Sequence, residues 1–163
     1  MEKLNFNAIK LLLKKNAKKR PILTCMNYKD DKIVFTDSYS LVEVATRNKV
    51  NFLLNVETLE TQGGTYPCTD NVKPFETDLK DVETIELTST EFDYKNKKLE
   101  TYSINGYPFD RKQVDSTFKT ISKDFFKDIS RNDLKIKENK SHGRLVYQKD
   151  GTYILILGIA KSE

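Results

Sequence analysis

The feature of this sequence that most constrains its fold is a pattern that occurs twice, an amphipathic helix followed by three short strands. In the first copy, apolar residues from Phe6 to Ala17 recur at helical spacing, and Asn5 is placed to cap that helix. The strand candidates that follow are Ile22–Tyr28, Lys32–Thr36 and Leu41–Thr46. A helix and a sheet that are each apolar on one side bury those sides against each other, so the pattern predicts an α+β fold.

The second copy of the pattern begins at Asp110. The spacing from Asp110 to Gln113 matches a D-x-x-Q capping box, which marks the start of a helix. The apolar stripe of this helix is Val114, Phe118 and Ile121. Its strand candidates are Leu134–Lys137, Arg144–Tyr147 and Tyr153–Ile159, with a hairpin turn at Asp150-Gly151.

The two copies can be aligned with each other. An offset of 105 positions superimposes the helices and places Lys14 on Lys119, whereas an offset of 112 superimposes the strands. The difference of seven predicts an inserted helical turn near Asp124–Ser130. Self-similarity of this kind indicates a structural repeat. Two unrelated helix-and-hairpin arrangements are the alternative, because that arrangement is common.

We predict a single domain of residues 1–163, with repeat unit one at about 1–60 and unit two at about 82–163. The segment between the helices is acidic, since residues 55–93 carry ten Asp/Glu against two Lys. Residues 1–20 carry seven Lys/Arg against one Glu. A folded domain with this distribution is expected to have one basic and one acidic face, although such charges can also be merely solvated.

The residues that catalysis would need are sparse. The single histidine, His142, falls in a polar turn, and the two cysteines form no metal-binding pair. Three turn aspartates could surround a metal ion, namely Asp30, Asp31 and Asp37, but aspartates in tight turns usually bond the local backbone. The sequence therefore predicts a protein that is not an enzyme and needs no cofactor or metal.

The sequence carries no membrane signal. Its longest apolar run, around Tyr153–Leu157, is too short to span a bilayer, and no secretory pattern opens the chain. We therefore expect a cytoplasmic protein with no membrane partner.

Basic residues follow the side of each helix that faces away from the apolar stripe. Lysine is a flexible point charge that binds phosphates without reading bases, so these residues predict contacts with the phosphates of a nucleic-acid backbone. Lysines that only solvate an exposed helix are the alternative. The expected DNA-binding residues are Lys10, Lys14, Lys15, Lys18, Arg20, Lys112, Lys119 and Lys123.

Several runs of sequence carry a family resemblance. They are Arg20-Pro21-Ile22-Leu23-Thr24, the turn from Tyr28 to Ile33, Thr36-Asp37-Ser38-Tyr39-Ser40-Leu41-Val42-Glu43, the loop Tyr66–Pro74, and the closing hairpin from Arg144 to Leu157. Together they resemble bacterial and phage DNA sliding clamps, the processivity factors of replicative polymerases.

This resemblance implies one clamp-like domain of two β-α-β-β-β units, in which two amphipathic helices pack on antiparallel sheets. It also implies that the lysines of these helices face the backbone of double-stranded DNA. Ser40 stands where the family motif usually has arginine, so one positive contact is missing. A clamp ring contains six such domains and this chain has length for one. A ring would therefore take six copies, or the chain acts without a ring.

We expect a clamp-like DNA replication accessory protein that binds DNA non-specifically, binds replication proteins, or does both, and that can form homo-oligomers. The alternative is a phage-type regulatory protein that does not bind DNA and instead binds a host or phage replication protein.

Overall fold

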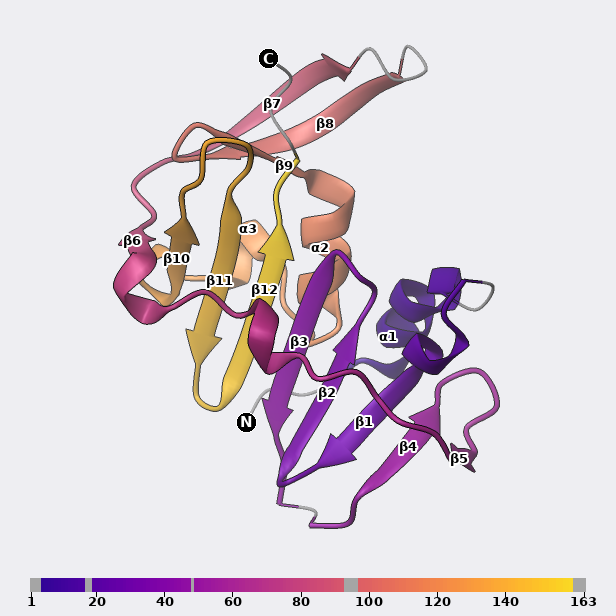
Figure 1. Ribbon diagram of the computed structural model, residues 1–163. Coiled ribbons are helices and arrows are strands. Elements are labelled where there is room, and N and C mark those ends of the chain that lie inside the picture. Colours follow the sequence, from indigo (N-terminus) through magenta and orange to yellow (C-terminus); the bar gives the residue numbers. More distant parts are fainter. Residues whose placement is uncertain (1–3, 17–18, 48, 93–96, 160–163) are drawn as a thin grey trace.

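The strands form two antiparallel sheets (Figure 1). This computed structural model describes residues 4–16, 19–47, 49–92 and 97–159. In that part of the chain the main sheet has nine strands, in the order β5-β4-β1-β2-β3-β12-β11-β10-β6, and the small sheet has three, in the order β7-β8-β9. The earlier strands are β1 (Cys25–Lys29), β2 (Lys32–Thr36), β3 (Ser40–Ala45), β4 (Phe52–Asn55), β5 (Thr61–Gln62) and β6 (Leu79–Asp81). The later strands are β7 (Ile85–Phe92), β8 (Lys97–Ile104), β9 (Tyr107–Asp110), β10 (Leu134–Lys137), β11 (Arg144–Lys149) and β12 (Thr152–Leu157).

The main sheet has an approximately symmetric strand order. β3 and β12 pair with each other in the middle of the sheet, where Val42 lies opposite Ile154. β2 and β11 flank this pair, and β1 and β10 follow outside them. Strands that the sequence aligned at an offset of 112 therefore occupy equivalent places. The limits of the two repeat units stay a prediction.

The helices begin where the sequence predicts. α1 spans Phe6–Leu13 and α2 spans Arg111–Lys119. The Asn5 side chain accepts a hydrogen bond from the amide of Ala8 at 3.1 Å, and Asp110 accepts one from the amide of Lys112 at 3.0 Å. Both side chains satisfy amides that the first helical turn leaves without partners. The inserted turn is α3, at Phe125–Asp128.

Two local predictions were wrong. Gln113 does not complete a capping box, because its side chain bonds to Asp37 and Ser40. The first strand begins at Cys25 rather than Ile22, because Pro21–Thr24 form a 3-10 turn. Proline fixes a helical φ at the start of that turn, and the Thr24 hydroxyl donates to the Pro21 carbonyl at 2.7 Å.

Both faces of the main sheet are covered. On one face, alternate strand residues pack with the inner sides of the helices, including Ile9, Leu13, Val114 and Phe118. On the other face, a smaller cluster of Val34, Leu41, Val146 and Leu155 packs with Tyr66, Leu79 and Tyr153. The residues between β5 and β6 cross this second face (Figure 1). We call residues 63–78 the connecting segment. Among the described residues, no helix is long and apolar enough to cross a membrane.

Candidate binding groove and helix surface

The two central helices lie next to each other. The amide of Asn5, at the start of α1, donates to the carbonyl of Thr120, at the end of α2, at 2.8 Å. Each helix buries its apolar stripe, and its opposite side is therefore left to solvent. Lys10, Lys14, Lys112 and Lys119 are all exposed. We call these four residues the helix-surface lysines.

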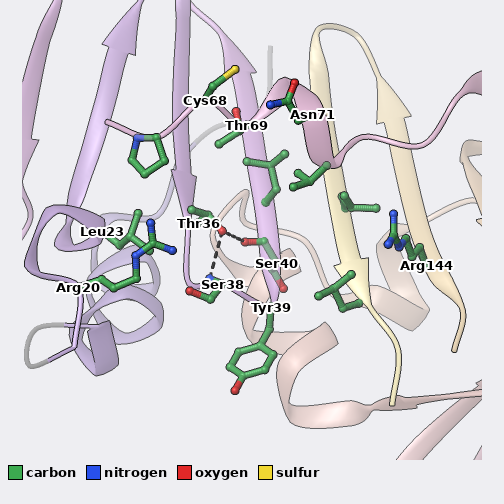
Figure 2. A pocket seen from close by; sticks show the side chains of 15 residues that line it. Arg20, Leu23, Thr36, Ser38, Tyr39, Ser40, Cys68, Thr69, Asn71 and Arg144 are labelled. Carbon is green, nitrogen blue, oxygen red and sulfur yellow. Dashed lines mark hydrogen bonds between the residues drawn. The ribbon is translucent and has the colours of Figure 1, made fainter. Parts of the chain in front are cut away.

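The remaining predicted DNA-binding residues are placed differently. Lys15 forms an ion pair with the buried Asp37. Arg20 lines a groove beside the connecting segment (Figure 2). Lys123 is half-buried after the end of α2. Lys18 lies outside the described residues.

The groove lies on the second sheet face and has a cavity volume of about 440 Å³. Its apolar lining comes from four separate parts of the chain: the 3-10 turn before β1, the start of β3, the connecting segment and β12. These apolar residues are Leu23, Leu41, Pro67, Val72, Leu155 and Leu157. Leu23, Leu41 and Leu155 are almost fully buried at its floor, whereas Val72 and Tyr39 are about half exposed at its rim.

Arginines lie on two sides of the groove. Arg20 and Arg144 come from opposite ends of the chain and lie on the left and right in Figure 2. The Nε of Arg144 is buried and has no hydrogen-bond partner among the described residues. A groove with an apolar floor and guanidinium groups beside it can bind a ligand that carries both apolar and acidic groups.

The turn between β2 and β3 forms one wall of the groove. The Thr36 hydroxyl donates to the Ser40 carbonyl at 2.6 Å and accepts from the Ser38 amide at 3.1 Å (Figure 2). Asp37 Oδ1 accepts from the amides of Tyr39 and Ser40, at 2.9 and 2.7 Å. These bonds fix the backbone that presents Ser38, Tyr39 and Ser40 to the groove.

An ion pair holds the connecting segment on the sheet. Lys73 Nζ lies 2.5 Å from Glu43 Oε2 and 4.9 Å from the ring centroid of Tyr153. The Glu43 side chain is only 7% exposed, so its charge needs a partner at this position. The contact fixes the segment just beyond Val72, the last residue that it contributes to the groove.

The turn aspartates do not come together. Asp30 and Asp31 precede β2, and Asp37 follows it, so the length of a strand separates them. Within the described residues, no group of three His, Cys, Asp or Glu side chains is placed to hold a metal ion. His142 Nδ1 lies 2.9 Å from the hydroxyl of the preceding residue, Ser141, in the turn that the sequence predicted.

The groove was not predicted from the sequence, although a signal for it was present. The runs from Arg20 to Thr24, from Thr36 to Glu43, from Tyr66 to Pro74 and from Arg144 to Leu157 carry the family resemblance, and each of them supplies groove residues. Because these runs are far apart in the chain, only the fold shows that they meet.

No protein-family model and no curated protein matches the sequence. Among solved structures, the DNA polymerase III subunit beta from Borrelia burgdorferi, determined in complex with a natural product, matches with a TM-score of 0.56 at 12% identity. The DNA polymerase sliding clamp from Bacillus subtilis matches with a TM-score of 0.57 at 11% identity. These alignments cover 99% and 98% of this chain, and 64% of each of those chains, which is less than two thirds of their length. The protein therefore has a sliding clamp-like α+β fold.

Proposed function

We propose that this protein is a non-enzymatic, clamp-type accessory protein of DNA replication whose groove binds an extended peptide segment of a replication protein. The single observation that carries this proposal is the groove itself, with its volume of about 440 Å³. The clamp-like fold supplies the replication context.

The chemistry of the groove favours a peptide over a rigid small molecule. Leu41 and Leu155 form an apolar floor that can bury two or three side chains of an extended segment. Arg20 and Arg144 can pair with carboxylates on either side of those side chains, and guanidinium groups bind carboxylates in a bidentate manner. The expected ligand is a short segment with adjacent apolar residues flanked by acidic ones.

The test is fluorescence anisotropy with a short labelled peptide that has two apolar side chains flanked by aspartates. We expect Val72→Asp to weaken binding by at least about tenfold, because it places a charge at the rim where the apolar side chains enter. Phe75→Asp is the matched control, since Phe75 is 77% exposed on the same connecting segment but does not line the groove. Equal affinity of wild type and Val72→Asp would contradict the proposal.

Contact with the DNA backbone is the second candidate function, and the observation that favours it is the set of helix-surface lysines. Their exposure on adjacent helices allows simple phosphate contacts without base reading. We expect Lys14→Glu combined with Lys119→Glu to abolish duplex binding at moderate salt. Lys29→Glu is the control, because Lys29 is an exposed lysine at the end of β1, away from both helices.

The peptide and DNA tests together distinguish a clamp-type protein from the alternative, a regulatory protein that does not bind DNA. A regulatory protein that binds only a replication protein would bind the peptide and show no association with duplex DNA at any salt concentration. A clamp-type protein that uses both surfaces would bind both, and only the DNA association would fall steeply as salt rises.

A further inference from the structure

Lys15 makes contacts that the helix-surface lysines do not make. Its ammonium lies 2.8 Å from Asp37 Oδ2, 3.2 Å from Gln113 Oε1 and 5.7 Å from the ring centroid of Tyr39. The Lys15 side chain is 45% exposed, whereas the Asp37 side chain is completely buried. Lys15 therefore places its ammonium against a buried carboxylate, while nearly half of its side chain remains exposed.

The carboxylate of Asp37 depends on this cation. Its Oδ1 accepts from two backbone amides of the groove wall, those of Tyr39 and Ser40. Its Oδ2 accepts from Gln113 Nε2 at 2.8 Å in addition to Lys15. A buried carboxylate that loses its counter-charge is costly, so removal of the Lys15 charge should make the structure around Asp37 rearrange.

The same network reaches α2 through Ser40. Gln113 Nε2 donates to Ser40 Oγ at 2.7 Å, and Ser40 Oγ lies 2.8 Å from the Thr117 hydroxyl. Tyr39 and Ser40 also line the groove. The groove wall is thus held by Lys15, in the 3-10 turn Lys14–Asn16 that follows α1, and by Gln113 and Thr117 of α2.

We infer that Lys15 is a positioning residue of the groove rather than a DNA contact. Its charge, opposed by a buried carboxylate at 2.8 Å, fixes the turn that carries Tyr39 and Ser40. Because the Lys15 ammonium is already paired with the Asp37 carboxylate, it should attract a DNA phosphate only weakly. The expected effect of Lys15 on peptide affinity rests on the proposed peptide-binding function, whereas its expected effect on the turn does not.

The experiment compares Lys15→Met, which keeps most of the side-chain stem and removes the charge, with Lys15→Arg, which restores a cation. We expect Lys15→Met to weaken binding of the acidic–apolar peptide by about tenfold, because the turn that carries Tyr39 and Ser40 loses the cation that fixes it, and Lys15→Arg to recover most of the affinity. Lys29→Met is the control for peptide binding. For duplex DNA, Lys14→Met should lower the salt dependence, and Lys15→Met should leave it unchanged.

Amide hydrogen exchange of the full chain provides the readout that does not need a peptide. We expect Lys15→Met to raise the exchange rates of the Tyr39 and Ser40 amides, which donate to Asp37, well above those in Lys29→Met. Unchanged exchange at these two amides in Lys15→Met would overturn the inference. It would also be overturned if Lys15→Met lost DNA binding but kept full affinity for the peptide. If wild type binds no peptide while the two amides still respond, the proposed function fails and the positioning role stands.

Discussion

At the scale of single residues, three two-residue hairpin turns need left-handed backbone at both positions. They are Asp30-Asp31, with φ of 54° and 64°, Asn105-Gly106, with 50° and 82°, and Asp150-Gly151, with 48° and 83°. Glycine adopts this conformation without steric cost, and it occupies the second position of two of the turns. The first and last of these turns were predicted from their sequences and are confirmed.

Asp31 is the second residue of its turn and is not a glycine, so Asp31→Gly should stabilise the protein. The expected gain is about 0.5–1 kcal/mol, because the left-handed conformation costs more for a residue with a Cβ than glycine loses in chain entropy. Thermal and urea unfolding of Asp31→Gly and Asp31→Ala measure it. Asp31→Ala is the control and should not stabilise. A Gly variant less stable than wild type would show that the aspartate side chain supports the turn.

The ionisation of Tyr153 should lower the free energy of unfolding of the protein at high pH. Burial, followed by the charges of Glu43 and Glu76, raises the pKa of Tyr153 to about 12. An unfolded tyrosine has a pKa of about 10, so above that pH the unfolded state loses a proton that the folded state retains. The stabilising contribution is complete below pH 10 and disappears as pH rises towards 12.

The corresponding variant is Tyr153→Phe, measured by urea unfolding between pH 8 and 11.5. Its stability should fall less than that of wild type, although not remain constant, because burial also raises the pKa of Tyr66 and of Tyr102. Tyr39→Phe is the control, because Tyr39 is 60% exposed. Parallel curves for wild type and Tyr153→Phe would contradict the expectation.

At the scale of helices and strands, local signals predicted what local forces decide. Asn5 and Asp110 were identified as caps because capping involves residues two or three positions away. Gln113 was misassigned because its partners, Asp37 and Ser40, are more than seventy positions away and become neighbours only in the fold. A capping pattern cannot tell a local partner from a distant one.

The core between α2 and the main sheet is built from aromatic rings, and it should be sensitive to truncation. The Phe118 ring is fully buried, with its centroid 5.2 Å from that of Phe125 in α3 and 5.4 Å from that of Tyr147 in β11. We expect Phe118→Ala to lower the free energy of unfolding by about 3–5 kcal/mol, from lost burial and the cavity that remains. Denaturant unfolding measures this change.

Phe126 provides the matched control within the same cluster. Its ring contacts Tyr102, but the residue is 45% exposed, so Phe126→Ala should cost about 1 kcal/mol or less. Similar losses for the two variants would mean that α3, rather than burial of Phe118 beneath α2, dominates the stability of this region.

At the scale of the whole molecule, the repeated pattern predicted which elements are equivalent but not how they join. Nothing in the local sequence of β3 or β12 indicates that these two strands pair in the centre of the main sheet. Residues Tyr66–Pro74 of the connecting segment were predicted as a loop, and the ion pair of Lys73 with Glu43 helps to hold the segment across the second sheet face. The groove arises from both of these long-range contacts, which explains why the sequence did not locate it.

The ends of the main sheet bear on whether copies of the chain form a ring. Its outermost strands are β5, with two residues, and β6, with three, so each end offers few backbone groups to a neighbouring copy. The longer β3 and β12 of the main sheet already pair with each other, and the longest edge strand of the described residues is β7 in the small sheet. We therefore expect light scattering on a sizing column to give the mass of one chain, 18.9 kDa, at both low and moderate salt.

A monomer cannot encircle DNA, so linear and closed circular duplexes should then bind equally and only through the helix-surface lysines. A six-subunit particle that retains circular DNA at high salt would contradict this expectation and would favour a topological hold on DNA.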